Sequence, residues 1–173
     1  DDIFIYDDEK NLIDIKSNSD LDYDYNFNSI CIIGLGHIGL PLLTHMLKKT
    51  NFITGYDNNP SSIKKIKNQN LNFFEKGLNS LLKYNLNKNK VRLTDKFNKI
   101  NANVYIVCLG SDLKSKNVNN SNLISSLKII AKKIYKNNLI LIRGTVQVGF
   151  TSIIAKKILE ETSGLKCGKD FFL

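Results

Sequence analysis

Short apolar runs alternate with amphipathic segments along the chain after residue 28. The runs are typical of buried parallel strands, and the segments between them repeat apolar residues at the three- and four-residue spacing of helices. We therefore expect strands over residues 30–34, 52–56, 91–94, 104–109, 139–142 and 167–173. We expect helices over residues 38–49, around Ile63 and Ile66, from Leu78 to Leu86, and over 121–136 and 150–162.

Strands that alternate with helices form a parallel sheet covered on both faces. Because crossovers between parallel strands are right-handed, we predict an α/β fold, a doubly wound, mainly parallel sheet with helices on both faces (Rossmann-like). In such sheets ligands lie beyond the carboxyl ends of the strands, near the point where the strand order reverses. Four strand ends should meet at one cleft, namely residues 34–39, Asp57, residues 110–112 and residues 143–145.

Three glycines follow the first apolar run with the spacing G-x-G-x-x-G, and an amphipathic helical pattern comes after them. In a turn of this kind Gly34 permits a tight bend, Gly36 lets the backbone approach a pyrophosphate, and Gly39 lets helix and strand pack closely. The phosphates would bind free N–H groups at the start of the helix, near His37 and Ile38. The alternative is that the glycines serve packing alone.

Asp57 ends the second predicted strand, about 20 residues beyond the glycines, where a carboxylate accepts hydrogen bonds from an adenosine ribose. This position favours NAD, because the carboxylate would repel a 2′-phosphate, although Lys64 and Lys65 leave NADP open. The alternative is that Asp57 caps the helix that begins near Pro60. Strand, glycine turn, helix, strand and acid in this order predict a dinucleotide-binding domain.

Length and charge suggest how the chain is divided. Its 173 residues suit one domain with a real core, which we place at residues 29–173 after an acidic N-terminal extension, residues 1–28. The extension has a net charge of −7 and the rest +16. Because the lysines are dispersed on predicted outer helix faces, they favour attraction of anionic nucleotides over specific nucleic-acid binding. The extension could be flexible or an edge strand.

The cysteines Cys31, Cys108 and Cys167 are odd in number and lack C-x-x-C spacing, which predicts reduced thiols, no metal site and a cytoplasmic protein. Cys31 and Cys108 lie in predicted strands, so burial should raise their pKa, and none of the three is expected to be a nucleophile.

No segment approaches the roughly 18 apolar residues of a membrane span, and we expect neither an export signal nor membrane contact.

Several segments resemble the N-terminal NAD-binding domain of the UDP-glucose/GDP-mannose dehydrogenase family, the nucleotide-sugar dehydrogenases. Residues 33–41, Ile-Gly-Leu-Gly-His-Ile-Gly-Leu-Pro, are similar to the family's opening, which usually has Tyr where His37 stands. Residues 55–59 resemble its acid-x-Asn strand end, and residues 74–78 its Glu-Pro-Gly-Leu segment with Lys in place of Pro. Residues 143–149 resemble its Arg-Ser-Thr-Val-x-x-Gly with Gly144 in place of Ser.

The resemblance covers residues 29–173 and implies oxidation of a UDP- or GDP-sugar alcohol to the uronic acid with two NAD, as in polysaccharide biosynthesis. Thr145 is the implied catalytic residue, helping to hold a water near the reacting carbon, unless it only ends a strand. Glu75 lies near cofactor or substrate, or is a solvated loop acid. The expected cofactor-binding residues are Gly34, Gly36, His37, Ile38, Gly39, Asp57, Asn59, Gly110, Ser111 and Thr145.

The sequence departs from the family's pattern in two respects. Residues 109–112, Leu-Gly-Ser-Asp, stand where the family has Val-Pro-Thr-Pro, and Asp112 adds a charge near the expected pyrophosphate. No Pro-Glu loop, dimerisation helices or cysteine-bearing domain follow Leu173, so we expect a fragment that binds NAD but is inactive alone, with homo-oligomers only in the full-length enzyme. The alternatives are a non-catalytic NAD-sensing or scaffold module and a 3-hydroxyacid-type dehydrogenase, against which the Gly-Thr-Val-x-x-Gly segment argues.

Overall fold

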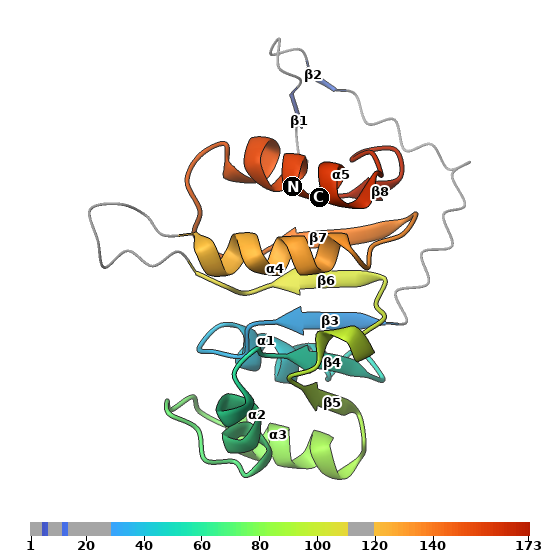
Figure 1. The fold of residues 1–173 in the computed structure, drawn as a ribbon. Coiled ribbons are helices and arrows are strands. Elements are labelled where there is room, and N and C mark those ends of the chain that lie inside the picture. Colours follow the sequence, from blue (N-terminus) through green and yellow to red (C-terminus); the bar gives the residue numbers. More distant parts are fainter. Residues whose placement is uncertain (1–4, 7–11, 14–28, 111–119) are drawn as a thin grey trace.

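A six-stranded parallel sheet runs through the structure, a computed structural model that describes residues 5–6, 12–13, 29–110 and 120–173 (Figure 1). Its strands are β3 (Ile30–Ile33), β4 (Ile53–Tyr56), β5 (Val91–Thr94), β6 (Val104–Val107), β7 (Asn138–Ile142) and β8 (Phe171–Phe172). The helices are α1 (Gly39–Met46), α2 (Pro60–Lys67), α3 (Leu78–Asn87), the 3₁₀ turn η1 (Phe97–Lys99), α4 (Ser121–Ala131), the π-helix η2 (Phe150–Ala155) and α5 (Lys156–Ser163).

The order of the strands across the sheet is β5-β4-β3-β6-β7-β8. From β3 the chain moves outward through β4 and β5, then returns to the other side of β3 and continues through β6, β7 and β8. The strand order therefore reverses between β3 and β6, and this is where a doubly wound sheet binds its ligand. The predicted fold class is confirmed.

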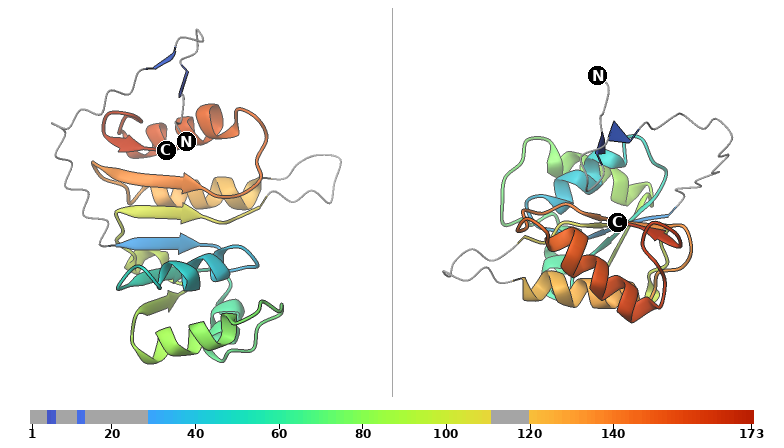
Figure 2. Two further views of the ribbon diagram at one scale, coloured as in Figure 1. Left: turned by 180° about the vertical axis from the view of Figure 1, so that it is seen from behind. Right: turned by 90° about the horizontal axis from the view of Figure 1, so that it is seen from above.

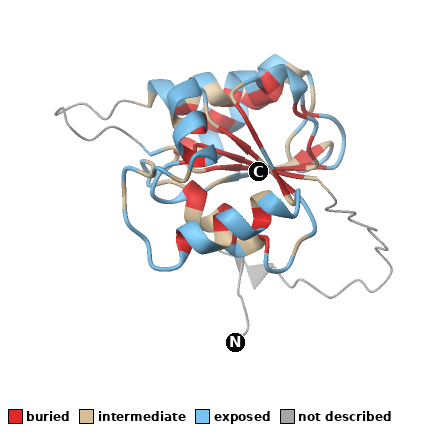
Figure 3. Cartoon of the chain, turned by 90° about the horizontal axis from the view of Figure 1, so that it is seen from below, coloured by how far each residue is buried: buried red, intermediate tan, exposed pale blue. Residues whose placement is uncertain are grey.

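Two apolar clusters hold the helices against the sheet, one on each face. The alternating pleat of β3 sends Cys31 and Ile33 into the cluster beneath α4 and α5, and Ile32 into the cluster beneath α1, α2 and α3. Seen end-on, helices lie on both sides of the sheet (Figure 2), and their buried residues face inward (Figure 3). Because both faces are covered at the centre of the sheet, β3 and β6 are buried along their whole length, whereas the edge strand β5 exposes Arg92.

The helices and strands lie where the sequence predicts them, but several begin or end at other residues than expected. Helix α4 stops at Ala131, although the buried Ile134 extends the apolar pattern beyond it. The segment predicted as one helix over 150–162 begins as the π-helix η2, which follows Gly149 at a φ of 82°. The last strand has only two residues, with a single bridge at Cys167 before it.

Within the N-terminal extension the structure describes two short strands, β1 (Ile5–Tyr6) and β2 (Leu12–Ile13). They pair with each other, antiparallel, in a sheet of their own, so β1 is not an edge strand of the main sheet. The other residues of the extension, and Ser111 and Asp112, lie outside the described residues. Among the helices that are described, none has the length and apolar character needed to cross a membrane.

Candidate functional site

The turn between β3 and α1 has the geometry expected of the three glycines. Gly34 has a φ of 87°, a conformation that other residues rarely adopt, and its N–H donates to the carbonyl of Tyr56 at 2.9 Å. A Cβ on Gly39 would collide with the carbonyl oxygen of Gly34, so the helix can approach the strand only without one. At Gly36, by contrast, a Cβ would meet no atom within 4 Å. The backbone at Gly36 is therefore accessible.

Asp57 connects the end of β4 to this turn. One carboxylate oxygen, Oδ2, accepts a hydrogen bond from the N–H of Leu35 at 3.0 Å, and Oδ1 accepts from the N–H of Asn59 at 2.9 Å. The N-cap of α2 is Asn59 rather than Asp57, because the Asn59 side chain accepts from the N–H of Ser61 at 2.9 Å. Asp57 is thus held beside the glycine turn and does not cap the helix.

Two hollows lie on either side of Asp57. One, of about 140 Å³, opens towards α2 and is lined by Leu35, Gly36 and His37 of the glycine turn. The other, of about 70 Å³, is lined by residues of β3, β4 and α4 together with Leu109. The second hollow lies at the reversal of strand order, between the ends of β3 and β6. A ligand that spans Asp57 would therefore contact both hollows.

The side chain of His37 packs on the loop between α2 and α3. Its ring lies 4.4 Å from the ring of Phe73, centroid to centroid, at an interplanar angle of 35°. Asn72 in the same loop accepts a hydrogen bond from Lys65 Nζ at 3.3 Å. No spacing signal in the sequence relates Phe73 to His37, so this contact between the loop and the glycine turn could not be predicted.

The loops that follow β6 and β7 meet beside the glycine turn. A Cβ on Gly144 would collide with the carbonyl oxygen of Leu109, and a Cβ on Gly34 would lie 2.6 Å from Leu109 Cδ2. Gly110 and Gly144 are therefore neighbours at the carboxyl edge of the sheet, as predicted. Thr145, the next residue, is exposed on the loop after β7.

Burial determines the state of the thiols. Cys31 is fully buried, and burial raises its pKa to about 12. Cys108 lies just past β6, where burial raises its pKa and the charge of Arg143 partly offsets the rise. Burial also raises the pKa of Cys167, with Lys156 opposing it. All three thiols are therefore protonated at neutral pH, which is the state expected of residues that are not nucleophiles.

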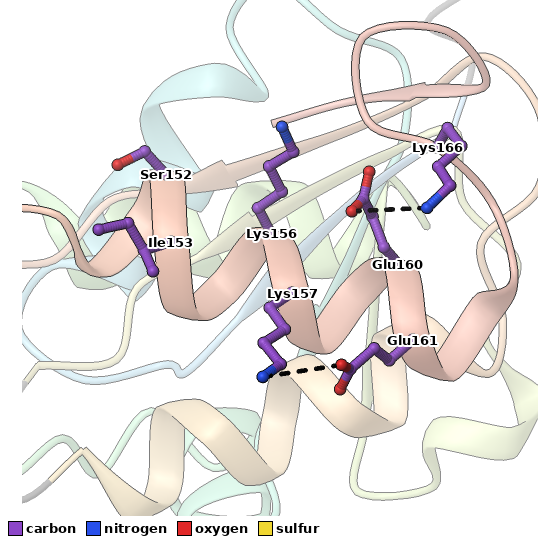
Figure 4. A pocket seen from close by; sticks show the side chains of 7 residues that line it. All are labelled: Ser152, Ile153, Lys156, Lys157, Glu160, Glu161 and Lys166. Atoms are coloured by element: carbon purple, nitrogen blue, oxygen red, sulfur yellow. Dashed lines mark ion pairs between the residues drawn. The ribbon is translucent and has the colours of Figure 1, made fainter.

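A larger hollow of about 450 Å³ lies along η2 and α5, away from the glycine turn (Figure 4). Two ion pairs cross its surface, between Lys166 and Glu160 at 4.0 Å and between Lys157 and Glu161 at 3.8 Å. None of its lining residues is a predicted site residue. Because two of its three lysines are paired with carboxylates and it lies away from the glycine turn, its size alone does not make it the functional site.

The reversed strand order, the glycine turn and the carboxylate beside it define the class of the protein, an α/β domain of the dinucleotide-binding type. The sequence matches over residues 28–173 the model of a family described as "UDP-glucose/GDP-mannose dehydrogenase family, NAD binding domain". The chain belongs to the UDP-glucose/GDP-mannose dehydrogenase family, in which this domain binds NAD. The resemblance inferred from the sequence is confirmed.

Relatives of the chain are dehydrogenases of nucleotide sugars. UDP-N-acetyl-D-mannosamine dehydrogenase of Pyrococcus horikoshii is 30% identical over 145 residues, 83% of this chain and 34% of that protein. UDP-N-acetyl-D-glucosamine 6-dehydrogenase of Pseudomonas aeruginosa is 28% identical over 149 residues, 83% of this chain and 33% of that protein. The solved structure of UDP-D-ManNAc dehydrogenase from P. horikoshii has a TM-score of 0.78 at 29% identity, covering 83% of this chain and 34% of that one. The chain spans about a third of the length of these relatives.

Proposed function

We propose that this chain is the NAD-binding domain of an enzyme that oxidises the alcohol of a nucleotide sugar to the uronic acid. The names of the relatives support UDP-linked N-acetylhexosamines as the substrate class. Oxidation of an alcohol to a carboxylate releases two hydrides, which two NAD accept, while water provides the second oxygen. The described residues of this chain are proposed to bind the NAD that accepts these hydrides.

The observation that carries the proposal is the hydrogen bond between Asp57 and the N–H of Leu35. It fixes a carboxylate beside a turn whose backbone at Gly36 is open. In the proposed complex the carboxylate accepts hydrogen bonds from the adenosine ribose, and the N–H groups at Gly36, His37 and Ile38 bind the pyrophosphate. The backbone at Gly34 and Gly39 keeps these groups in place.

The proposed nicotinamide side of the site is the edge formed by the loops after β6 and β7. Gly110 and Thr145 lie there, and Thr145 is the proposed catalytic residue, holding a water near the reacting carbon. Asn59 takes part through its N–H, which holds Asp57 in position. Ser111 is proposed as a cofactor contact on its sequence position alone.

Titration of the chain with NAD tests the proposal directly. We expect a rise in melting temperature of roughly 5–10 °C at a hundredfold excess over Kd, because NAD binds only the folded state. Asp57→Asn should weaken binding about 10- to 100-fold, since a charge-assisted hydrogen bond to the ribose is lost. Calorimetry measures both affinities.

Asp95→Asn is the matched control, because Asp95 follows β5 as Asp57 follows β4, and its carboxylate pairs with Lys96. This variant should bind NAD like the parent chain. No binding by the parent chain at millimolar NAD, or equal loss of affinity in both variants, would contradict the proposal. Formation of two NADH for each UDP-N-acetylhexosamine by the whole protein tests the reaction.

A further inference from the structure

Lysines gather at the amino edge of the sheet, the edge away from the glycine turn. Helices α1, α3 and α4 run antiparallel to the strands, so each ends near the amino end of the strand that follows it. The carbonyl of Lys90, for example, accepts a hydrogen bond from the N–H of Ile53, the first residue of β4, at 3.0 Å. We call the lysines that follow these three helices the basic edge, which consists of Lys48, Lys49, Lys88, Lys90, Lys132 and Lys133.

Within the described part of the chain, the basic edge has no acidic partner. None of its lysines forms an ion pair with a described carboxylate. One group of described acids lies at the carboxyl ends of β4 and β5 and before α3, namely Asp57, Asp95 and Glu75. The other group lies beyond β7 and pairs with lysines there, namely Glu160, Glu161 and Asp170. The positive charge of the basic edge is therefore not neutralised by a described residue.

The chain enters the domain in the middle of this edge. Ser29 lies directly before β3, the strand between β4 and β6, and its carbonyl accepts a hydrogen bond from the N–H of Asn103 at 2.9 Å. The Asn103 side chain donates to the Tyr135 hydroxyl at 3.1 Å, which ties Ser29 to the segment that follows α4. The ends of α1 and α4 thus lie on either side of the point where the N-terminal extension is attached.

The sequence directly before Ser29 has the opposite charge. Residues 1–28 have a net charge of −7, and residues 20–25 read Asp-Leu-Asp-Tyr-Asp-Tyr. Because the three carboxylates occupy alternate positions, an extended segment would present them all on one side. The nine residues from Asp20 to Asn28 span up to about 30 Å at roughly 3.3 Å for each residue. Since neighbouring strands are only about 4.8 Å apart, the basic edge lies within that reach.

We propose that Asp20, Asp22 and Asp24 bind the basic edge of their own chain. The tether favours this occupant over a second copy, because a segment attached beside its binding surface has an effective concentration of roughly millimolar. The contacts are exposed ion pairs, so each is weak and salt should reduce them. The glycine turn lies at the other end of the strands, and the inference therefore does not depend on cofactor binding.

Acetylation of the lysines of the full chain, followed at each site by mass spectrometry, tests the proposal. The triple variant Asp20→Asn, Asp22→Asn, Asp24→Asn should raise the acetylation rate at the basic edge about threefold, the change expected if the segment covers the lysines about two-thirds of the time. The exposed Lys64 and Lys65 of α2 should react at the parent rate. At about 1 M salt, where the screening length is about 3 Å, the parent chain and the variant should react alike.

The matched control is the triple variant Asp7→Asn, Asp8→Asn, Glu9→Gln, which removes the same charge from the far part of the extension. It should keep the parent acetylation rates, and melting temperatures report whether each variant folds. Equal rates in the parent chain and the first variant, or an equal increase in the control, would overturn the proposal. Protection that is lost when the parent chain is diluted about tenfold would also overturn it, because a second copy would then be the occupant.

Discussion

At the scale of single residues, the three glycines of the first turn differ in what a side chain would meet. A methyl group on Gly39 would collide with backbone, whereas one on Gly36 would enter open space. Gly36 also lacks the positive φ of Gly34, so an alanine there fits the backbone. The same motif therefore contains one glycine required by the fold and one available to a ligand.

We therefore expect alanine at Gly39 to reduce stability and alanine at Gly36 to reduce the affinity for NAD. Gly39→Ala should lower the free energy of unfolding by about 3 kcal/mol or more, because helix and strand must separate. Gly36→Ala should keep the parent stability within about 0.5 kcal/mol but weaken NAD binding at least about tenfold, since its methyl group occupies the proposed phosphate position. Urea unfolding and calorimetry measure the two effects, and a stable Gly39→Ala variant would contradict the assignment.

Asp57 and the glycines could be predicted from the sequence because a single βαβ unit places them at a characteristic spacing. Phe73 could not be predicted in the same way. It reaches the site because the loop between α2 and α3 packs on the glycine turn, and no local pattern marks such a contact. Gly144 was seen only as a departure from a family pattern, and its physical reason, the carbonyl oxygen of Leu109, needed the structure.

At the scale of elements, strand and helix positions followed from apolar spacing, but their ends did not. Apolar residues continue past the end of α4 at Ala131, where the N–H of Ile134 still donates to the carbonyl of Ile130 at 3.0 Å and Ile134 remains buried. The π-helix η2 keeps an apolar pattern close to that of an ordinary helix, so the sequence predicted one uniform element. Residue types indicate which positions are buried, but they do not indicate which carbonyl each backbone N–H bonds to.

The contact between His37 and Phe73 joins the α2–α3 loop to the glycine turn, and its effect on cofactor binding can be measured. We expect His37→Ala and Phe73→Ala each to weaken NAD binding about 3- to 10-fold, because the tilted ring contact fixes the orientation of the His37 peptide. Both substitutions remove the same contact. The double variant should therefore bind NAD about as tightly as the single variant with the lower affinity. Calorimetry on the parent chain, the two single variants and the double variant gives the coupling free energy between His37 and Phe73.

Phe74→Ala is the control for this cycle, because Phe74 is the adjacent aromatic residue and is 89% exposed. Its affinity for NAD should equal that of the parent chain. Additive losses of affinity in the double variant would show that the contact between the two rings does not position the turn.

At the scale of the whole molecule, the apolar cluster beneath α4 and α5 encloses a thiol and a phenol in their neutral form. Burial raises the pKa of Cys31 to about 12, and that of Tyr105 to about 12. Both belong to the cluster beneath α4 and α5, and the Tyr105 hydroxyl has no hydrogen-bond partner among the described residues. Deprotonation of either group therefore favours the unfolded chain, in which water solvates the charge.

The stability of the folded protein should therefore decrease in alkaline solution. The contribution of Cys31 is complete below its usual pKa of 9.0 and is lost as the pH rises towards the folded value of about 12. The expected slope is about 1.4 kcal/mol for each pH unit and group. Cys31→Val, which removes the thiol and keeps a similar volume, should give a shallower decline in urea unfolding measured between about pH 9 and 11. An unchanged slope would contradict this account.

The close approach of Gly144 to the carbonyl oxygen of Leu109 has a consequence for how this domain can diverge. The chain departs from the family's pattern in both of the segments that make this contact, at residues 109–112 and at Gly144. We infer that the two departures depend on each other, because a serine at 144 would require the carbonyl group of Leu109 to move. Homologues should gain or lose the two features as a pair, and chimeras should exchange both segments together.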